Sequence, residues 1–168
     1  VRLLNPLCPE AFGTLIHNSS ETGKIKAIAA KDNITSIKIK SSRMLLAYGF
    51  LRKIFEIFED NKTAIDMITT SEVGVSVTID NTKNLEQIIS GLKTLGEVTV
   101  EEDMVIICVV GDLKWQNTGF EAKVLNAIST IPVRMISYGG SNHNVSVLIH
   151  KDDKIEALNL LSNHLFNN

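Results

Sequence analysis

Two stretches of this 168-residue chain repeat one another at a spacing of about 70 residues. A repeat of this length indicates two copies of one small folded unit, which constrains the fold more than the length does, since 168 residues allow one domain or two. The shared residues occur in the same order in both copies, as Gly49-Phe50 and Gly119-Phe120, Lys53-Ile54 and Lys123-Val124, and Val75-Ser76-Val77 and Val145-Ser146-Val147.

The first copy predicts the order strand, helix, strand, strand, helix, strand. Alternating apolar residues mark strands, and apolar residues spaced by three and four mark helices. The expected elements are a strand at 37–40, a helix from 50 to about 60, strands at 64–70 and 73–79, a helix from 85 to 95 ended by Gly96, and a strand at 97–101.

The second copy shows the same pattern but stops after its second helix. Its expected elements are a strand at 104–110, a helix at 120–129, strands at 133–137 and 144–150, and a helix at 153–165. The segment from Lys24 to Ala30 is the remaining strand-like stretch, and it can fill the open sheet edge of the second copy. We therefore predict an α+β protein in which the first βαββαβ unit is inserted into the second.

Each unit is expected to form a ferredoxin-like, four-stranded antiparallel sheet with its helices on one face. The predicted organisation is a leader at 1–23, a first unit at 34–101, and a second unit made of 24–31 plus 102–168. The acidic run Glu101-Glu102-Asp103 falls between the two copies, where we expect a solvated turn.

Composition excludes several classes of function. The net charge is −2 and aromatic residues make up 5% of the chain, which argues against nucleic acid as the main partner. The cysteines, Cys8 and Cys108, form no metal or disulfide motif. Apolar runs are too short to cross a membrane, and no signal peptide is recognisable, so we expect a soluble, cytoplasmic protein with no membrane partner.

No catalytic motif is present, and the four histidines lack the spacing of metal ligands, so the sequence predicts neither catalytic nor metal-binding residues. Asp66 stands out because it is a charge inside an apolar strand pattern. It either binds a cation or lies on the open face or edge of the sheet. The turn from Thr70 to Val73 and the free N–H groups of Phe50 and Leu51 at a helix start add polar groups that suit an amino acid.

Three segments of the sequence resemble the C-terminal regulatory region of bacterial aspartate kinases. They are M-L-L-A-Y-G-F-L-R-K-I-F-E-I-F at 44–58, I-D-M-I-T-T-S-E-V at 65–73 and V-R-M-I-S-Y-G-G-S-N-H-N at 133–144. The resemblance covers nearly the whole chain and implies two ACT domains, one inserted in the other. Asn5-Pro6 and Gly13-Thr14-Leu15-Ile16 resemble the end of the kinase catalytic domain. The chain would then be a fragment without cofactor, whose parent enzyme phosphorylates aspartate with ATP and Mg²⁺.

The resemblance also implies an allosteric effector and a homodimer. The end of the chain is similar to that of monofunctional, lysine-sensitive members, in which lysine lies between the first ACT domains of two subunits. Leu46 and Ala47 stand where some of these members carry His and Ser, so threonine as the effector, or no tightly bound ligand, remains an alternative. The matching effector positions are Met44, Gly49, Phe50, Leu51, Ile65, Asp66, Thr70, Ser71 and Glu72.

Three other functions share the βαββαβ plan. A free-standing tandem ACT sensor without a kinase is the strongest of them. An acylphosphatase-like enzyme needs an Arg in the first strand-to-helix loop, for which Arg43 is the candidate. An RNA-binding module needs aromatic residues on its central strands, and the stretch 73–79 has none.

Overall fold

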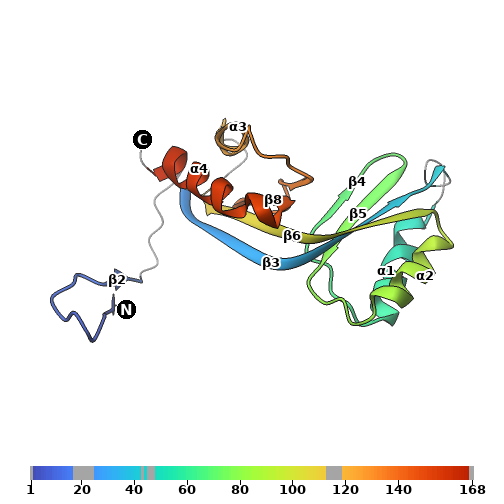
Figure 1. Cartoon of the computed structure of the whole chain (residues 1–168), viewed down its shortest axis with the longest axis horizontal. Helices are drawn as coiled ribbons and strands as arrows, with labels where there is room; N and C mark the ends of the chain where they lie inside the picture. The colour runs from blue at the N-terminus through green and yellow to red at the C-terminus, as the bar shows by residue number, and fades with distance from the viewer. Residues whose placement is uncertain (1, 17–24, 43, 45–47, 113–118, 167–168) are drawn as a thin grey trace.

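The computed structural model describes residues 2–16, 25–42, 44, 48–112 and 119–166, and its centre is one six-stranded antiparallel sheet. The strand order is β4-β5-β3-β6-β8-β7. These strands are β3 (Ile25–Lys40), β4 (Ile68–Thr70), β5 (Gly74–Ile79), β6 (Glu97–Gly111), β7 (Met135–Ser137) and β8 (Asn144–His150). A short ribbon of β1 (Arg2–Leu3) and β2 (Thr14–Leu15) lies apart from this sheet (Figure 1).

Four helices accompany the sheet: α1 (Phe50–Asp60), α2 (Leu85–Lys93), α3 (Phe120–Ala127) and α4 (Lys154–Phe166). A 3₁₀ turn at Lys151–Asp153 leads into α4. We call β4, β5, α1 and α2 with the adjoining halves of β3 and β6 the first unit. The second unit comprises β7, β8, α3 and α4 with the other halves of the same two strands. The predicted α+β plan and its antiparallel pairing are confirmed.

The two long strands correct the prediction of two separate four-stranded sheets. β3 joins the predicted strands at 24–30 and 37–40 into one strand, and it pairs with β6 along its length. β6 likewise continues through Glu101-Glu102-Asp103, so the predicted turn at that place is wrong. The second unit does take its missing strand from the N-terminal half of β3, because Ala27 pairs with Val110 and Ala30 with Ile107. Lys24 lies outside the described residues.

Both long strands contain a left-handed residue at the point where the units meet. Asn33 has φ 59° and Asp103 has φ 60°, and the two positions are 70 residues apart, as are the copies of the repeat. The pairing register shifts on either side of the pair Ile34 and Met104. Asn and Asp tolerate this conformation better than other residues with a side chain. These bulges let each strand continue from one unit into the other, where a turn was expected.

Each unit has its own aliphatic core beneath its helices, and a third, smaller core joins them. Ile37, Ile39, Val75 and Val77 belong to the first core, and Val105, Ile107 and Val109 to the second. The junction core lies on the opposite face of the sheet and consists of Ile34, Met67, Met104, Ile106, Met135 and Leu148. Both helix pairs therefore cover the same face of the sheet, and the sheet's twist carries one pair above it and the other below it in Figure 1.

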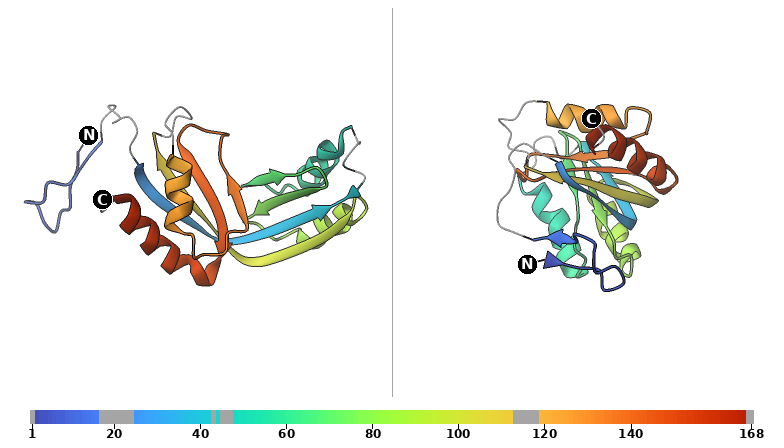
Figure 2. Two further views of the ribbon diagram at one scale, coloured as in Figure 1. Left: turned by 90° about the horizontal axis from the view of Figure 1, so that it is seen from above. Right: turned by 90° about the vertical axis from the view of Figure 1, so that its left-hand side faces the viewer.

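The strands β4 and β7 form the two opposite edges of the sheet, yet they contact each other. Figure 2 shows their ends approaching over the face that lacks helices. The strand predicted from Ala64 begins only at Ile68. Before it the pairing with β5 is irregular, since the Asp66 N–H donates to the Thr78 carbonyl and the Met67 N–H donates to the Thr78 hydroxyl. Asp66 consequently precedes β4 and does not lie within it.

Candidate functional site

The first unit exposes an apolar face along its free side. Tyr48, Leu51 and Phe55 follow one stripe of α1 and its approach, and Val73 lies in the turn between β4 and β5. Leu51 is 37% exposed and Phe55 is 42% exposed. Since β4 is an edge strand, its outer backbone groups are also open to pairing. A free strand edge beside exposed apolar side chains is typical of a surface that receives a partner.

The N-terminus of α1 lies at the far end of the first unit, away from the junction. Gly49 begins it with φ 78°, and no side chain of the described residues caps it. The first N–H groups of the helix, including those of Phe50 and Leu51, have no helical acceptor, and the helix dipole favours a negative group there. The Phe50 ring is buried in the core of the first unit, so only its backbone faces a ligand.

The turn from Thr70 to Val73 lies at the same far end. The Ser71 N–H donates to the Gly74 carbonyl at 2.8 Å, and the Ser41 N–H donates to the Val73 carbonyl at 2.9 Å. These bonds fix the turn against the end of β3, while Ser71 and Glu72 stay exposed. The far group of predicted effector residues therefore consists of Met44, Gly49, Phe50, Leu51, Thr70, Ser71 and Glu72.

Asp66 and Ile65 lie at the opposite end of the first unit, beside the junction. Asp66 Oδ1 is 2.6 Å from the Nζ of Lys31 on β3, and the same ammonium is 2.8 Å from Asp80 Oδ2. The hydrogen bonds to Asp66 and then Asp80 raise the pKa of Lys31. In return, the hydrogen bond from Lys31 lowers the pKa of Asp80. Asp66 thus binds an internal cation, a partner that is 35 residues away and that the sequence pattern did not indicate.

The structure does not bring all predicted effector residues together within one chain. Asp66 and Glu72 are six positions apart along an extended segment, a separation of about 20 Å, which exceeds the length of a lysine molecule. The helix start at Phe50 belongs to the Glu72 end, because α1 ends near Asn84 at the junction, where Asn84 Nδ2 donates to the Asn61 carbonyl. Leu46 and Ala47 lie outside the described residues.

The second unit carries the inverse charges at the equivalent place. Glu101 stands 70 positions after Lys31, and Arg134, which matches Asp66 after the two-residue gap of the repeat, forms an ion pair with it. Asn142 occupies the position that matches Glu72, because the Gly111 N–H donates to the His143 carbonyl as the Ser41 N–H donates to the Val73 carbonyl, 70 residues earlier. The acids that suit an ammonium group in the first unit have no acidic counterpart in the second.

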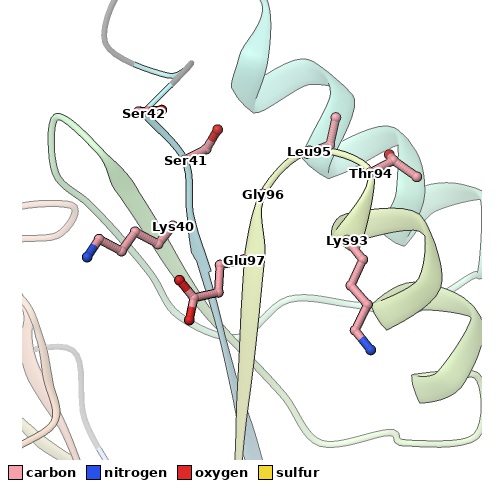
Figure 3. A pocket seen from close by; sticks show the side chains of 8 residues that line it. All are labelled: Lys40, Ser41, Ser42, Lys93, Thr94, Leu95, Gly96 and Glu97. Atoms are coloured by element: carbon pink, nitrogen blue, oxygen red, sulfur yellow. The ribbon is translucent and has the colours of Figure 1, made fainter.

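Among the described residues, hollows also lie away from the predicted effector positions. One, of about 300 Å³, is at the end of β3 and the start of β6 (Figure 3), and Lys40 and Lys93 at its rim point away from each other. It therefore lacks convergent charges for an anion. Another, of about 510 Å³, lies at the junction and is lined by Met104, Arg134, His150 and their neighbours. Among the described residues, no group of three or more His, Cys, Asp or Glu can hold a metal ion, and no helix is long and apolar enough to span a membrane.

Comparison with known proteins identifies the family to which this architecture belongs. The ACT domain family model matches residues 107–165. The solved C-terminal regulatory domain of aspartate kinase from Porphyromonas gingivalis W83 is 60% identical, with a TM-score of 0.77, and the match covers 84% of this chain and 97% of that one. The lysine-sensitive aspartokinase 3 of Escherichia coli is 31% identical over 94% of this chain and 37% of its own length.

The structure of E. coli aspartokinase III in complex with lysine and aspartate, a T-state, has a TM-score of 0.81 at 33% identity, covering 94% of this chain and 37% of that one. A tandem ACT architecture and this degree of identity define the class of protein. The chain belongs to the family of aspartate kinase regulatory regions, and it spans about a third of the length of the curated relatives that it matches.

Proposed function

We propose that this chain is the amino-acid-sensing regulatory region of a cytoplasmic aspartate kinase. The parent enzyme would transfer the γ-phosphoryl group of ATP, with Mg²⁺, to the side-chain carboxylate of L-aspartate. The observation that carries the proposal is the 60% identity to an aspartate kinase regulatory domain over nearly all of that domain. The relatives named here are aspartate kinases, which favours this function over a free-standing sensor.

Lysine is the proposed effector. It carries two ammonium groups and one carboxylate, and the candidate residues supply Asp66, Glu72 and the free N–H groups at the start of α1. Threonine, with one ammonium group, leaves one of the two acids without a partner. The E. coli relative is named as lysine-sensitive, and its structure contains lysine.

A homodimer formed through the first units completes the proposed site. If β4 pairs antiparallel with β4 of a second copy, centred on Thr69, Asp66 of one chain lies opposite Glu72 of the other, because both are three positions from Thr69. Neighbouring strands are about 4.8 Å apart. Asp66 of one chain and Glu72 of the other are then neighbours, although the two residues are about 20 Å apart within one chain. The same contact covers the exposed side chains of Leu51 and Phe55. The effector then binds between two chains.

Regulation follows from differential affinity. Lysine bound between the paired first units stabilises the dimer arrangement in which the attached kinase domains are inactive. A ligand that binds both arrangements equally shifts nothing, so the active arrangement must bind lysine more weakly.

Titration calorimetry against lysine, threonine and methionine tests the effector. We expect heat and a rise in melting temperature with lysine at millimolar concentration. A response to threonine with none to lysine contradicts the effector assignment. A reading frame around this sequence that encodes no kinase domain contradicts the proposed parent enzyme.

A further inference from the structure

Lys31 is held between two carboxylates at the junction of the units. Its Nζ lies 2.6 Å from Asp66 Oδ1 and 2.8 Å from Asp80 Oδ2. Lys31 belongs to β3, two positions before the left-handed residue Asn33. A lysine side chain is an ammonium at neutral pH. Both hydrogen bonds raise the pKa of Lys31 further. One internal cation therefore serves two anions that come from different segments of the first unit.

Only one oxygen of Asp66 is used by this network. Oδ1 accepts from Lys31, and the second oxygen has no further partner among the described residues. A second ammonium that binds the free oxygen lies within a few ångströms of the first, and two like charges at that distance repel. Lys31 can yield without losing all its stabilisation, because Asp80 remains as its partner.

We propose that Lys31 competes with the effector's ammonium group for Asp66 and so sets the affinity of the site for cationic ligands. This inference rests on the proposed function, since it takes Asp66 to be an effector ligand. An arriving ammonium displaces Lys31 toward Asp80. Since β3 is shared by both units, this displacement carries the occupancy of the effector site to the junction.

The repeat supplies an internal control for this inference. Glu101 matches Lys31, and its ion pair with Arg134 matches the pair of Lys31 and Asp66 with the charges exchanged. Both pairs link a shared long strand to the segment before an edge strand. Breaking the pair in the second unit costs a similar surface interaction but leaves the effector's acid untouched.

The experiment is calorimetric titration of lysine into the wild type, Lys31→Met, Asp80→Asn and Glu101→Gln at low and high salt. Lys31→Met is expected to bind lysine at least about fivefold more tightly at low salt, because the competing charge is gone. Asp80→Asn is expected to bind more weakly, because Lys31 then depends on Asp66 alone. Both differences shrink in high salt, and Glu101→Gln binds like the wild type.

The two directions separate competition from simple positioning of Asp66. If Lys31 only orients Asp66, Lys31→Met weakens binding, and that result overturns the inference, as does an unchanged affinity. Lys31→Arg keeps the charge and is expected to bind like the wild type, while circular dichroism confirms that each variant is folded. Absence of lysine binding by the wild type itself contradicts the proposed function and the competition together.

Discussion

The two units share one backbone plan but differ in the charges at its equivalent positions. The first unit has Asp66 and Glu72 where the second has Arg134 and Asn142. Both start their first helix after a left-handed glycine, Gly49 or Gly119, with φ near 80°. The shared plan forms the scaffold in both units, whereas the acids that recognise an amine occur in only one.

The units also differ in how much apolar side chain their first helices expose. Leu51 and Phe55 leave α1 with an exposed apolar stripe, whereas the matching positions on α3 are Glu121 and Leu125, both half-buried. A free apolar stripe suits a subunit contact, and a polar or covered one does not. The first unit therefore presents an apolar face that the matching helix of the second unit lacks.

The largest expected effects test whether the units are independent. Leu92 in the first core and Leu161 in the second are fully buried. Leu92→Ala and Leu161→Ala are each expected to lower the free energy of unfolding by about 2–5 kcal/mol. Because β3 and β6 pass through both units, each variant should still unfold in one transition in calorimetry. Two separated transitions contradict this cooperativity.

The next comparison concerns the charged positions before the edge strands. Asp66→Ala is expected to weaken lysine binding about tenfold or more, because it removes an anion that faces an ammonium group. Arg134→Gln, at the matching place, should leave lysine binding unchanged. Calorimetric titration measures both, and thermal unfolding checks that both fold. Equal losses in the two variants mean that Asp66 acts through structure and not through contact with lysine.

A third comparison concerns the outer faces. Phe55→Glu places a charge in the proposed subunit contact and is expected to raise the dimer dissociation constant about tenfold or more. Ile155 on α4 is 68% exposed and serves as the control, since Ile155→Glu alters an apolar residue of the second unit. Sedimentation velocity measures both. If Ile155→Glu dissociates the dimer and Phe55→Glu does not, the subunit contact lies on the second unit and the proposed contact is wrong.

The smallest effects are expected at the two left-handed positions. Asp103 pairs with Lys151 at 2.8 Å, and this hydrogen bond lowers the pKa of Asp103. A carboxyl group whose pKa is lower in the folded protein than in the unfolded chain stabilises the fold at pH values above the unfolded-chain pKa. That stabilisation is lost as the pH falls through the folded-state pKa. Asp103→Asn should therefore lower the urea midpoint slightly at pH 7, and this difference should shrink toward about pH 2 as Asp103 takes up a proton.

Asn33 provides the uncharged counterpart. Asn33→Ala is expected to lower the free energy of unfolding by about 1 kcal/mol, because Ala is strained in the left-handed conformation. This loss should be the same at both pH values. Because Asn tolerates this backbone as well as Asp does, a loss for Asp103→Asn that persists at low pH would contradict the ion pair with Lys151 as its cause.

Much of the fold followed from local patterns. The alternation at Ile37 and Ile39 and the helical spacing from Phe50 to Phe58 predicted elements that the structure contains. The strand missing from the second copy predicted the role of the segment before the first copy, since an unfilled sheet edge leaves backbone groups unpaired. The sequence also predicted candidate effector residues near Gly49 and Thr70, and the structure places these two groups at the same end of the first unit.

The sequence by itself determined the repeat, the element types, the interleaving of the copies and the family. Only the tertiary structure decided that β3 and β6 are continuous, because a charged run such as Glu101-Glu102-Asp103 looks like a turn locally, and strand pairing overrides that preference. It also decided the partner of Asp66. Lys31 is 35 residues away, and a contact between such distant residues arises only when the sheet assembles and places both beside its junction.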